Sequence, residues 1–138
     1  MSRNSVDCVS GILIDKGRVL VERRRSDDAG DPGLVVLPGG HVEPGEPLKH
    51  AIAREMGEEL GITPNRMIPV SVAYHVASDG ERQRVHYFHV RDWTGKIESK
   101  EAELVYWESD PGNLSFSSER RLVLKIVRNT WKENSPAA

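Results

Sequence analysis

The sequence predicts an α+β fold in which a mixed β-sheet lies between two helices. Short runs rich in Val, Ile and aromatic residues recur along the chain and are bounded by Gly, Pro and Asp, as strands are. Two longer segments instead repeat apolar residues at helical spacing. No linker, repeat or low-complexity tract interrupts the 138 residues. We therefore expect residues 1–138 to form one domain with its helices and strands packed in layers.

The first part of the chain contains three predicted strands. Residues 6–14 and 18–24 are largely apolar and flank the turn Asp-Lys-Gly, which is typical of a β-hairpin. Residues 26–33 form a loop by composition. Residues 34–37 form a short apolar strand that ends at Pro38. The chain then enters its first helix.

We expect the first helix to begin at Pro47 and to end at Gly61. Proline suits the first helical position because its missing N–H group would have no partner there. Glu46 lies favourably beside the positive end of the helix. Glycine is common just beyond a helix end, and Pro64 follows it closely.

The remaining chain contains three further strands and a second helix. Residues 67–78 and 85–93 flank a polar turn and predict a second long hairpin. Residues 103–107 form another strand. Residues 117–132 form the second helix, which begins in a pair of serines that can cap it.

Composition excludes several classes of protein. The net charge of −2 provides no broad basic surface for a nucleic-acid polymer or an anionic membrane. No apolar run is long enough to span a bilayer, and the first residues lack the apolar region of a signal peptide. The single Cys8 cannot form an internal disulfide. We therefore expect a cytoplasmic protein.

Three glutamates near the end of the first helix are placed unfavourably. Glu55, Glu58 and Glu59 oppose the helix dipole and repel one another at helical spacing. At about 100° per residue they share a face that overlaps the apolar stripe of the helix. Buried carboxylates are normally paired or bound to metal, and hard ions such as Mg²⁺ or Mn²⁺ prefer oxygen ligands. The alternative is a charged surface helix in which Arg54 pairs with its neighbours.

The residues around this helix match a known motif. Five residues separate Gly40 from Glu46, and seven more precede Arg-Glu-Met-Gly-Glu-Glu-Leu-Gly-Ile at 54–62. This matches every specified position of the Nudix box, G-x5-E-x7-R-E-U-x-E-E-x-G-U, where U is aliphatic. Seven fixed positions give a chance match on the order of 10⁻⁸ per start point at average residue usage. The chain therefore resembles the Nudix hydrolases over nearly its whole length.

The resemblance implies an α/β/α sandwich and metal-dependent hydrolysis of a nucleoside diphosphate linked to another group. Glu55, Glu58 and Glu59 resemble the ligands of Mg²⁺ or Mn²⁺, and the carbonyl of Gly39 or Gly40 is a plausible extra ligand. Bound metal would neutralise phosphoryl charge, acidify the attacking water and position it. Three further residues resemble supporting positions of the box, namely Arg54, which orients the carboxylates, Glu46 and Gly61.

Two residues are candidates for the general base that takes the proton from water. Glu58 lies within the box. Glu101 lies in a segment that resembles a late loop, from which some members bring a further catalytic or metal-binding glutamate. Glu103 is a competing choice, and an exposed loop acid is the simpler interpretation of Glu101.

Four residues outside the box are candidate substrate contacts. Arg23 and Arg24 end the second strand, where MutT-like members carry two arginines, one of which contacts the nucleotide. Leu37 stands where that branch often has a stacking Phe, and Ser118 stands where it has a base-reading Asn. A hydroxyl offers fewer directed hydrogen bonds than an amide, so 8-oxoguanine specificity is in doubt.

Markers of the ADP-ribose and dinucleoside polyphosphate branches are also missing. By elimination we expect a nucleoside or deoxynucleoside triphosphate, cleaved to monophosphate and pyrophosphate, with clean-up of oxidised nucleotides left open. ADP-ribose or a nucleotide sugar is the alternative substrate.

Two other functional classes share this fold. A nucleotide-sensing Nudix module binds without cleavage, but such modules often carry a damaged box, and this box is complete. A prenyl diphosphate isomerase needs a reactive cysteine in its pocket, and Cys8 lies in an apolar strand. Trp93, Trp107 and Trp131 are expected to pack against the sheet or in a dimer contact, so a homodimer is left open.

Overall fold

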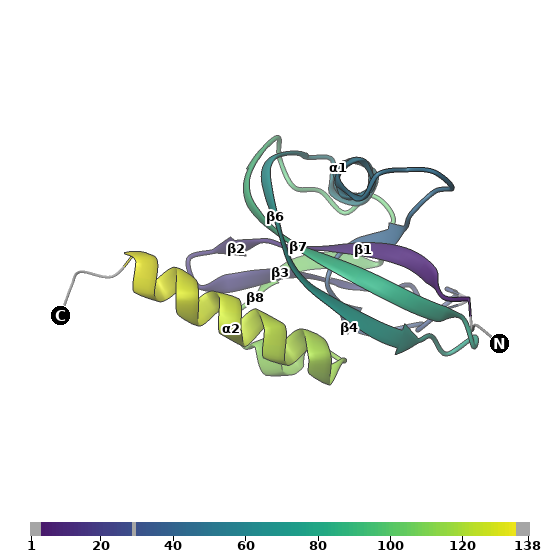
Figure 1. The fold of residues 1–138 in the computed structure, drawn as a ribbon. Coiled ribbons are helices and arrows are strands. Elements are labelled where there is room, and N and C mark those ends of the chain that lie inside the picture. Colours follow the sequence, from purple (N-terminus) through teal and green to yellow (C-terminus); the bar gives the residue numbers. More distant parts are fainter. Residues whose placement is uncertain (1–3, 29, 135–138) are drawn as a thin grey trace.

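Two β-sheets and two α-helices make up the fold of the described residues (Figure 1). The computed structural model describes residues 4–28 and 30–134, with side chains up to residue 130. The first sheet has the order β5–β1–β7–β6 and consists of β1 (Val6–Ile12), β5 (Gly39–His41), β6 (Thr63–Val76) and β7 (Arg82–Thr94). In the second sheet β3 pairs with each other strand, and its members are β2 (Ile14–Asp15), β3 (Arg18–Arg23), β4 (Val35–Val36) and β8 (Leu104–Glu108).

Strand β1 makes the first sheet mixed. It runs parallel to β7, with Cys8 opposite Val85, and antiparallel to β5, with Ser10 opposite Gly39. Strands β6 and β7 form the long antiparallel hairpin that the sequence predicts, and β6 lies at the sheet edge. The α+β class is therefore confirmed.

The predicted hairpin between residues 6–14 and 18–24 is wrong in one respect. Within residues 6–14, only the short strand β2 pairs with β3, whereas β1 ends before Leu13 and belongs to the other sheet. Val9 and Ile12 project from opposite faces of β1 into different hydrophobic clusters, and both are fully buried. A strand buried on both faces belongs in the middle of a sheet rather than in an isolated ribbon. The single sheet expected from the sequence is consequently two sheets.

Helices α1 (Leu48–Leu60) and α2 (Ser117–Asn134) confirm the two predicted helices. Pro47 precedes α1 in an extended conformation, so the helix begins one residue later than predicted. Gly61 ends α1 as expected, because its φ of 72° is left-handed and its N–H donates to the carbonyl of Gly57. The end of the acidic helix is thereby fixed.

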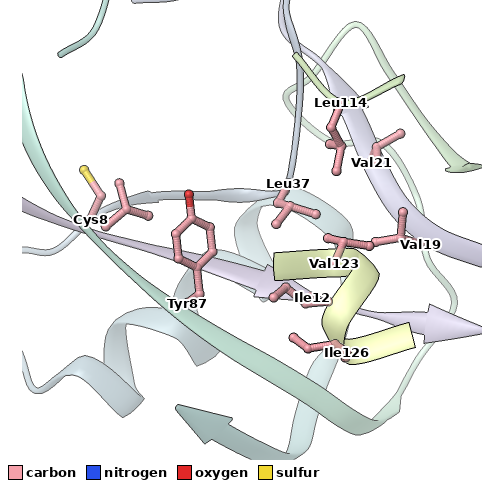
Figure 2. Packing of buried hydrophobic residues seen from close by; sticks show 10 residues of the cluster. Cys8, Ile12, Val19, Val21, Leu37, Tyr87, Leu114, Val123 and Ile126 are labelled. Carbon is pink, nitrogen blue, oxygen red and sulfur yellow. The ribbon is translucent and has the colours of Figure 1, made fainter. Parts of the chain in front are cut away.

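The two helices lie on opposite sides of the strands (Figure 1). Helix α1 packs one hydrophobic cluster through Ile52 and Met56. Helix α2 follows the short 3-10 helix η1 (Pro111–Asn113) and packs the second cluster through Val123 and Ile126 (Figure 2). Over the described residues, neither helix is long and apolar enough to cross a membrane.

Two of the three tryptophans pack against each other. The rings of Trp93 and Trp107 stack with centroids 6.4 Å apart beside the cluster under α1. Arg18 lies over the Trp107 ring, 5.9 Å from its centroid. The side chain of Trp131 lies outside the described residues. The described pair is partly buried and packs against that cluster, which agrees with the expected packing against the sheet.

Candidate functional site

A cavity of about 580 Å³ lies between the two sheets, the C-terminal half of α1 and the start of α2. Its volume suits a small-molecule ligand. One end is acidic and is lined by Glu22, Glu55, Glu58, Glu59 and Glu101. The other end is largely apolar and is lined by residues that include Cys8, Leu37, Val85, Tyr87 and Phe116. The cavity therefore has two chemically different ends.

Arg54 organises the acidic end. Its Nε and Nη2 atoms donate to the two carboxylate oxygens of Glu46, each at 2.8 Å. Its Nη1 atom donates to Glu55 Oε1 at 2.9 Å and to Glu58 Oε2 at 3.1 Å, and Nη2 also donates to the His41 carbonyl. The Arg54 hydrogen bonds hold the pKa of Glu46 at about 2. A planar guanidinium bound on both edges fixes the direction of its partners.

Two glycines allow the backbone to pass close to this network. A Cβ atom at Gly40 would collide with both carboxylate oxygens of Glu55. A Cβ atom at Gly39 would collide with the Val9 carbonyl of the neighbouring strand β1. Both positions therefore require glycine for space rather than for an unusual φ angle. The Glu55 carboxylate consequently rests directly on the β5 backbone.

The deeper acids hold their protons unusually tightly. Burial raises the pKa of Glu59 to about 8, and repulsion from Glu101 and Glu55 adds to the effect. Burial likewise raises the pKa of Glu55 above its usual value. Burial and then repulsion from Glu59 raise the pKa of Glu22 to about 9. Negative charge at this end is therefore undercompensated by the protein itself.

Glu22 is a buried acidic residue of this end that sequence reasoning missed. It lies in β3, and only 2% of its surface is exposed. The signal is a charged residue that follows the apolar run Val19–Val21 within a strand, because such a position alternates toward the interior.

The acidic end has the right donors for a hard divalent ion. It offers carboxylate oxygens and backbone carbonyls, and Glu22 Oε2 is buried without a hydrogen-bond partner in the described residues. Across the same residues, no three acidic, histidine or cysteine side chains converge closely enough to form a ready coordination shell. A bound ion would therefore have to draw these carboxylates closer together.

A buried carboxyl group lies at the apolar end. Glu119, at the start of α2, accepts hydrogen bonds from the Tyr87 hydroxyl at 2.9 Å and from the Leu37 N–H at 3.2 Å. Burial raises the pKa of Glu119 to about 7. His75 contacts the Phe116 ring at a centroid distance of 4.4 Å and lies 2.8 Å from an Asp31 carboxylate oxygen. Few polar groups in an apolar wall are typical of a site that orients a ligand.

The candidate substrate residues divide between the cavity and the surface. Arg24 lines the cavity, and its Nε donates to the Gly30 carbonyl at 2.8 Å. Leu37 and Ser118 line the apolar end. Arg23 is exposed on β3 and is not among the described residues that line the cavity.

Two alternatives from the sequence can be placed in the same way. Glu101 lines the acidic end, whereas the exposed Glu103 is not one of the described lining residues. Cys8 lines the apolar end, and burial raises the pKa of its thiol to about 12. A thiol held so firmly protonated is a poor nucleophile, which disfavours isomerase chemistry.

Comparison with known proteins agrees with this geometry. A family model described as the NUDIX domain matches residues 1–117. The chain is 32% identical over 118 residues to a CTP pyrophosphohydrolase of Escherichia coli, covering 80% of this chain and 81% of the relative. It is 29% identical over 99 residues to an 8-oxo-dGTP diphosphatase of the same organism, covering 72% and 76%. The crystal structure of a MutT NUDIX hydrolase from Burkholderia pseudomallei superimposes with a TM-score of 0.78 at 24% identity, covering 90% of this chain and 99% of that one.

Proposed function

The chain belongs to the NUDIX family and is a pyrophosphohydrolase, and from this premise we propose that its substrate is a nucleoside triphosphate. The products would be the monophosphate and pyrophosphate, released with Mg²⁺ or Mn²⁺ as the cofactor. The observation that carries the proposal is a cavity that has an acidic end and an apolar end. A nucleoside triphosphate bears its negative charge at one end and its base at the other. The phosphates therefore suit the acidic, metal-binding end of the cavity, and the base suits the apolar end.

At the acidic end, Glu55, Glu58, Glu59 and the carbonyl of Gly40 would hold the ion, which neutralises phosphoryl charge and acidifies water. Arg54 fixes the orientation of Glu55 and Glu58 through its Nη1 hydrogen bonds. These residues would hold the ion where negative charge develops during phosphoryl transfer.

Two residues are kept as candidates for the proton acceptor. Glu58 is half exposed at the mouth of the cavity and is held by Arg54. Glu101 lines the cavity close enough to Glu59 to raise its pKa by repulsion. Either carboxylate can accept a proton from a water that lies between them and the phosphate chain.

At the apolar end, Leu37, Tyr87 and Phe116 would contact the base. Ser118 and Glu119 offer polar atoms there for its hydrogen-bonding edge. Arg24, between the two ends, would contact the phosphates, since guanidinium groups bind phosphate oxygens in pairs. The free thiol of Cys8 fits the reducing cytoplasm as the compartment of this reaction.

The proposal is tested with a panel of CTP, dCTP, ATP, 8-oxo-dGTP, ADP-ribose and UDP-glucose, each with Mg²⁺ or Mn²⁺. We expect a nucleoside triphosphate to be cleaved fastest, with monophosphate and pyrophosphate released in equal amounts. Preferential cleavage of ADP-ribose or the sugar nucleotide would show that the substrate belongs to that class and not to the nucleoside triphosphates. Tight nucleotide binding with no turnover of any compound would identify a sensor instead.

A further inference from the structure

Glu22 points from the second sheet toward the acidic helix. Its backbone is paired on both sides, with Val36 of β4 and with Val105 of β8, so the residue cannot swing away. Leu20, two positions earlier, belongs to the hydrophobic cluster under α1. Because residues two apart on a strand share a face, the Glu22 side chain projects on the α1 side of β3 and into the cavity.

The Glu22 carboxyl group is buried, and one of its oxygen atoms lacks a hydrogen-bond partner among the described residues. Glu22 is 2% exposed, and its Oε2 atom has no hydrogen-bond partner within the described part of the chain. Native proteins leave few buried polar atoms unpaired, so each such atom calls for a partner. A buried carboxylate in particular is normally paired with a cation or a metal.

The neighbouring charges do not supply that partner. Glu59 and Glu55 both repel Glu22 across the cavity. Arg24 attracts it, but the Arg24 guanidinium donates to the Gly30 carbonyl and lies 3.6 Å from Asp28. Glu22, Glu55 and Glu59 thus line one part of the cavity, and the nearby Arg24 and Arg54 guanidiniums donate their hydrogen bonds to other groups and leave Glu22 Oε2 without a partner among the described residues.

We propose that Glu22 is a further ligand of the divalent-metal centre, from the strand wall that faces the box helix. This inference rests on the proposed metal-dependent function. Oxygen-rich sites of mixed carboxylates suit Mg²⁺ and Mn²⁺, and an ion between β3 and α1 would complete the coordination of the orphan oxygen. The centre would then be anchored on both walls of the cavity.

Isothermal titration with Mn²⁺, in the absence of nucleotide, tests the assignment. We expect Glu22→Gln to weaken Mn²⁺ affinity at least about 10-fold, in the range that loss of a metal-centre residue typically costs. Glu59→Gln serves as the positive control. Asp15→Asn serves as the charge-matched control and should change affinity less than about 2-fold. Asp15 is exposed at the end of β2, opposite Arg18 at the start of β3, and is not one of the described residues that line the cavity.

Wild-type Mn²⁺ affinity in Glu22→Gln, together with a weakened Glu59→Gln, would overturn the assignment and leave the proposed function intact. Failure of the wild-type protein to bind Mn²⁺ at all would overturn both. Anomalous scattering from Mn²⁺-soaked crystals gives an independent reading, in which a Glu22 oxygen should lie in the coordination shell. Its absence from that shell would also count against Glu22.

Thermal unfolding with and without Mn²⁺ separates binding from folding. We expect Mn²⁺ to raise the Tm of the wild-type protein and to raise that of Glu22→Gln less, because the stabilisation by a ligand grows with the logarithm of its concentration divided by its Kd. If Glu22→Gln does not fold, Glu22→Asp takes its place, since it keeps the charge but withdraws the oxygens by one methylene. Wild-type Mn²⁺ affinity in Glu22→Asp would contradict direct coordination.

Discussion

The Tyr87 hydroxyl donates a hydrogen bond to Glu119 Oε2 at 2.9 Å and so ties β7 to the start of α2 under the apolar end of the cavity. Glu119 is almost fully buried, and this burial raises the pKa of its carboxyl group from 4.5 to about 7. The folded protein therefore binds this proton more tightly than the unfolded chain does. Stability from this group is complete below about pH 4.5 and is lost as the pH rises through 7.

We accordingly expect the free energy of unfolding of the metal-free protein to fall between pH 5 and pH 8. One such proton contributes a slope of up to about 1.4 kcal/mol per pH unit. Glu119→Gln should flatten the slope in urea unfolding measured across this range, whereas the exposed Glu103→Gln should not. An unchanged slope in Glu119→Gln would show that the carboxyl group titrates normally.

Gly40 and Gly57 form a matched pair for alanine substitution. A Cβ atom at Gly40 would collide with the Glu55 carboxylate, so Gly40→Ala should displace that proposed ligand. We expect a destabilisation of about 1–3 kcal/mol and a loss of Mn²⁺ affinity. Gly57 lies exposed within α1, and a Cβ atom there would make only an ordinary van der Waals contact with the Ile62 carbonyl at 3.8 Å, so Gly57→Ala should stabilise the helix by about 0.5–1 kcal/mol.

Denaturant unfolding and Mn²⁺ titration of the two variants check this pair. Equal effects of both substitutions would mean that the close approach of Gly40 to Glu55 is not what fixes the carboxylate.

The two candidate bases are distinguished by isosteric substitution. Glu58→Gln and Glu101→Gln each remove a proton acceptor while preserving shape. We expect kcat for the true base to fall about 10²-fold or more, in line with general-base contributions. Mn²⁺ affinity, measured on the same samples, tells loss of a base from loss of a ligand. Small and equal losses of kcat in both variants would exclude both residues as the base.

Arg24 and Arg23 differ in position, so their alanine variants should differ in kinetics. Arg24 lines the cavity, and loss of a charged phosphate contact costs about 1.5–3 kcal/mol, so Arg24→Ala should raise KM at least about 10-fold. Arg23 is exposed outside it, and Arg23→Ala should change KM less than about 2-fold. Steady-state kinetics with the preferred triphosphate provide the measurement.

Arg24→Lys is a control for the effect of Arg24 on the loop that contains Gly30. It keeps the positive charge but removes the Nε–H that donates to the Gly30 carbonyl. The opposite ranking, with Arg23 the more damaging, would place the phosphates outside the cavity.

The sequence predicted those parts of the fold that local chemistry determines. Gly61 ends α1 because only a residue that tolerates a left-handed φ closes the helix there, and a glycine can be read directly from the chain. The β6–β7 hairpin was equally readable, since its two strands adjoin a polar turn. The box predicted which acids of α1 line a common cavity, because its spacing is specific.

The errors involve pairing between distant segments. Strand β1 pairs with β7, which lies more than seventy residues away, and the residues of β1 and its turn do not indicate a parallel partner. Strand β5 includes Gly39 and Gly40, which are poor strand formers, and forms only because the glycines let it lie against β1. Glu22 was missed for the same reason. Its place in the acidic end depends on contact with α1, a helix that follows about thirty residues later in the chain.

The two ends of the cavity are built by different elements. Glu55, Glu58 and Glu59 come from α1. The apolar-end residues come from other elements, namely Cys8 from β1, Leu37 just after β4, Val85 and Tyr87 from β7, Phe116 just before α2 and Ser118 from its start. Substitutions at the second set can change which base fits without disturbing the hydrolytic groups. Such a scaffold can diversify its substrates through a few mutations at one wall, and a laboratory seeking an altered nucleotide preference can confine its libraries to that wall.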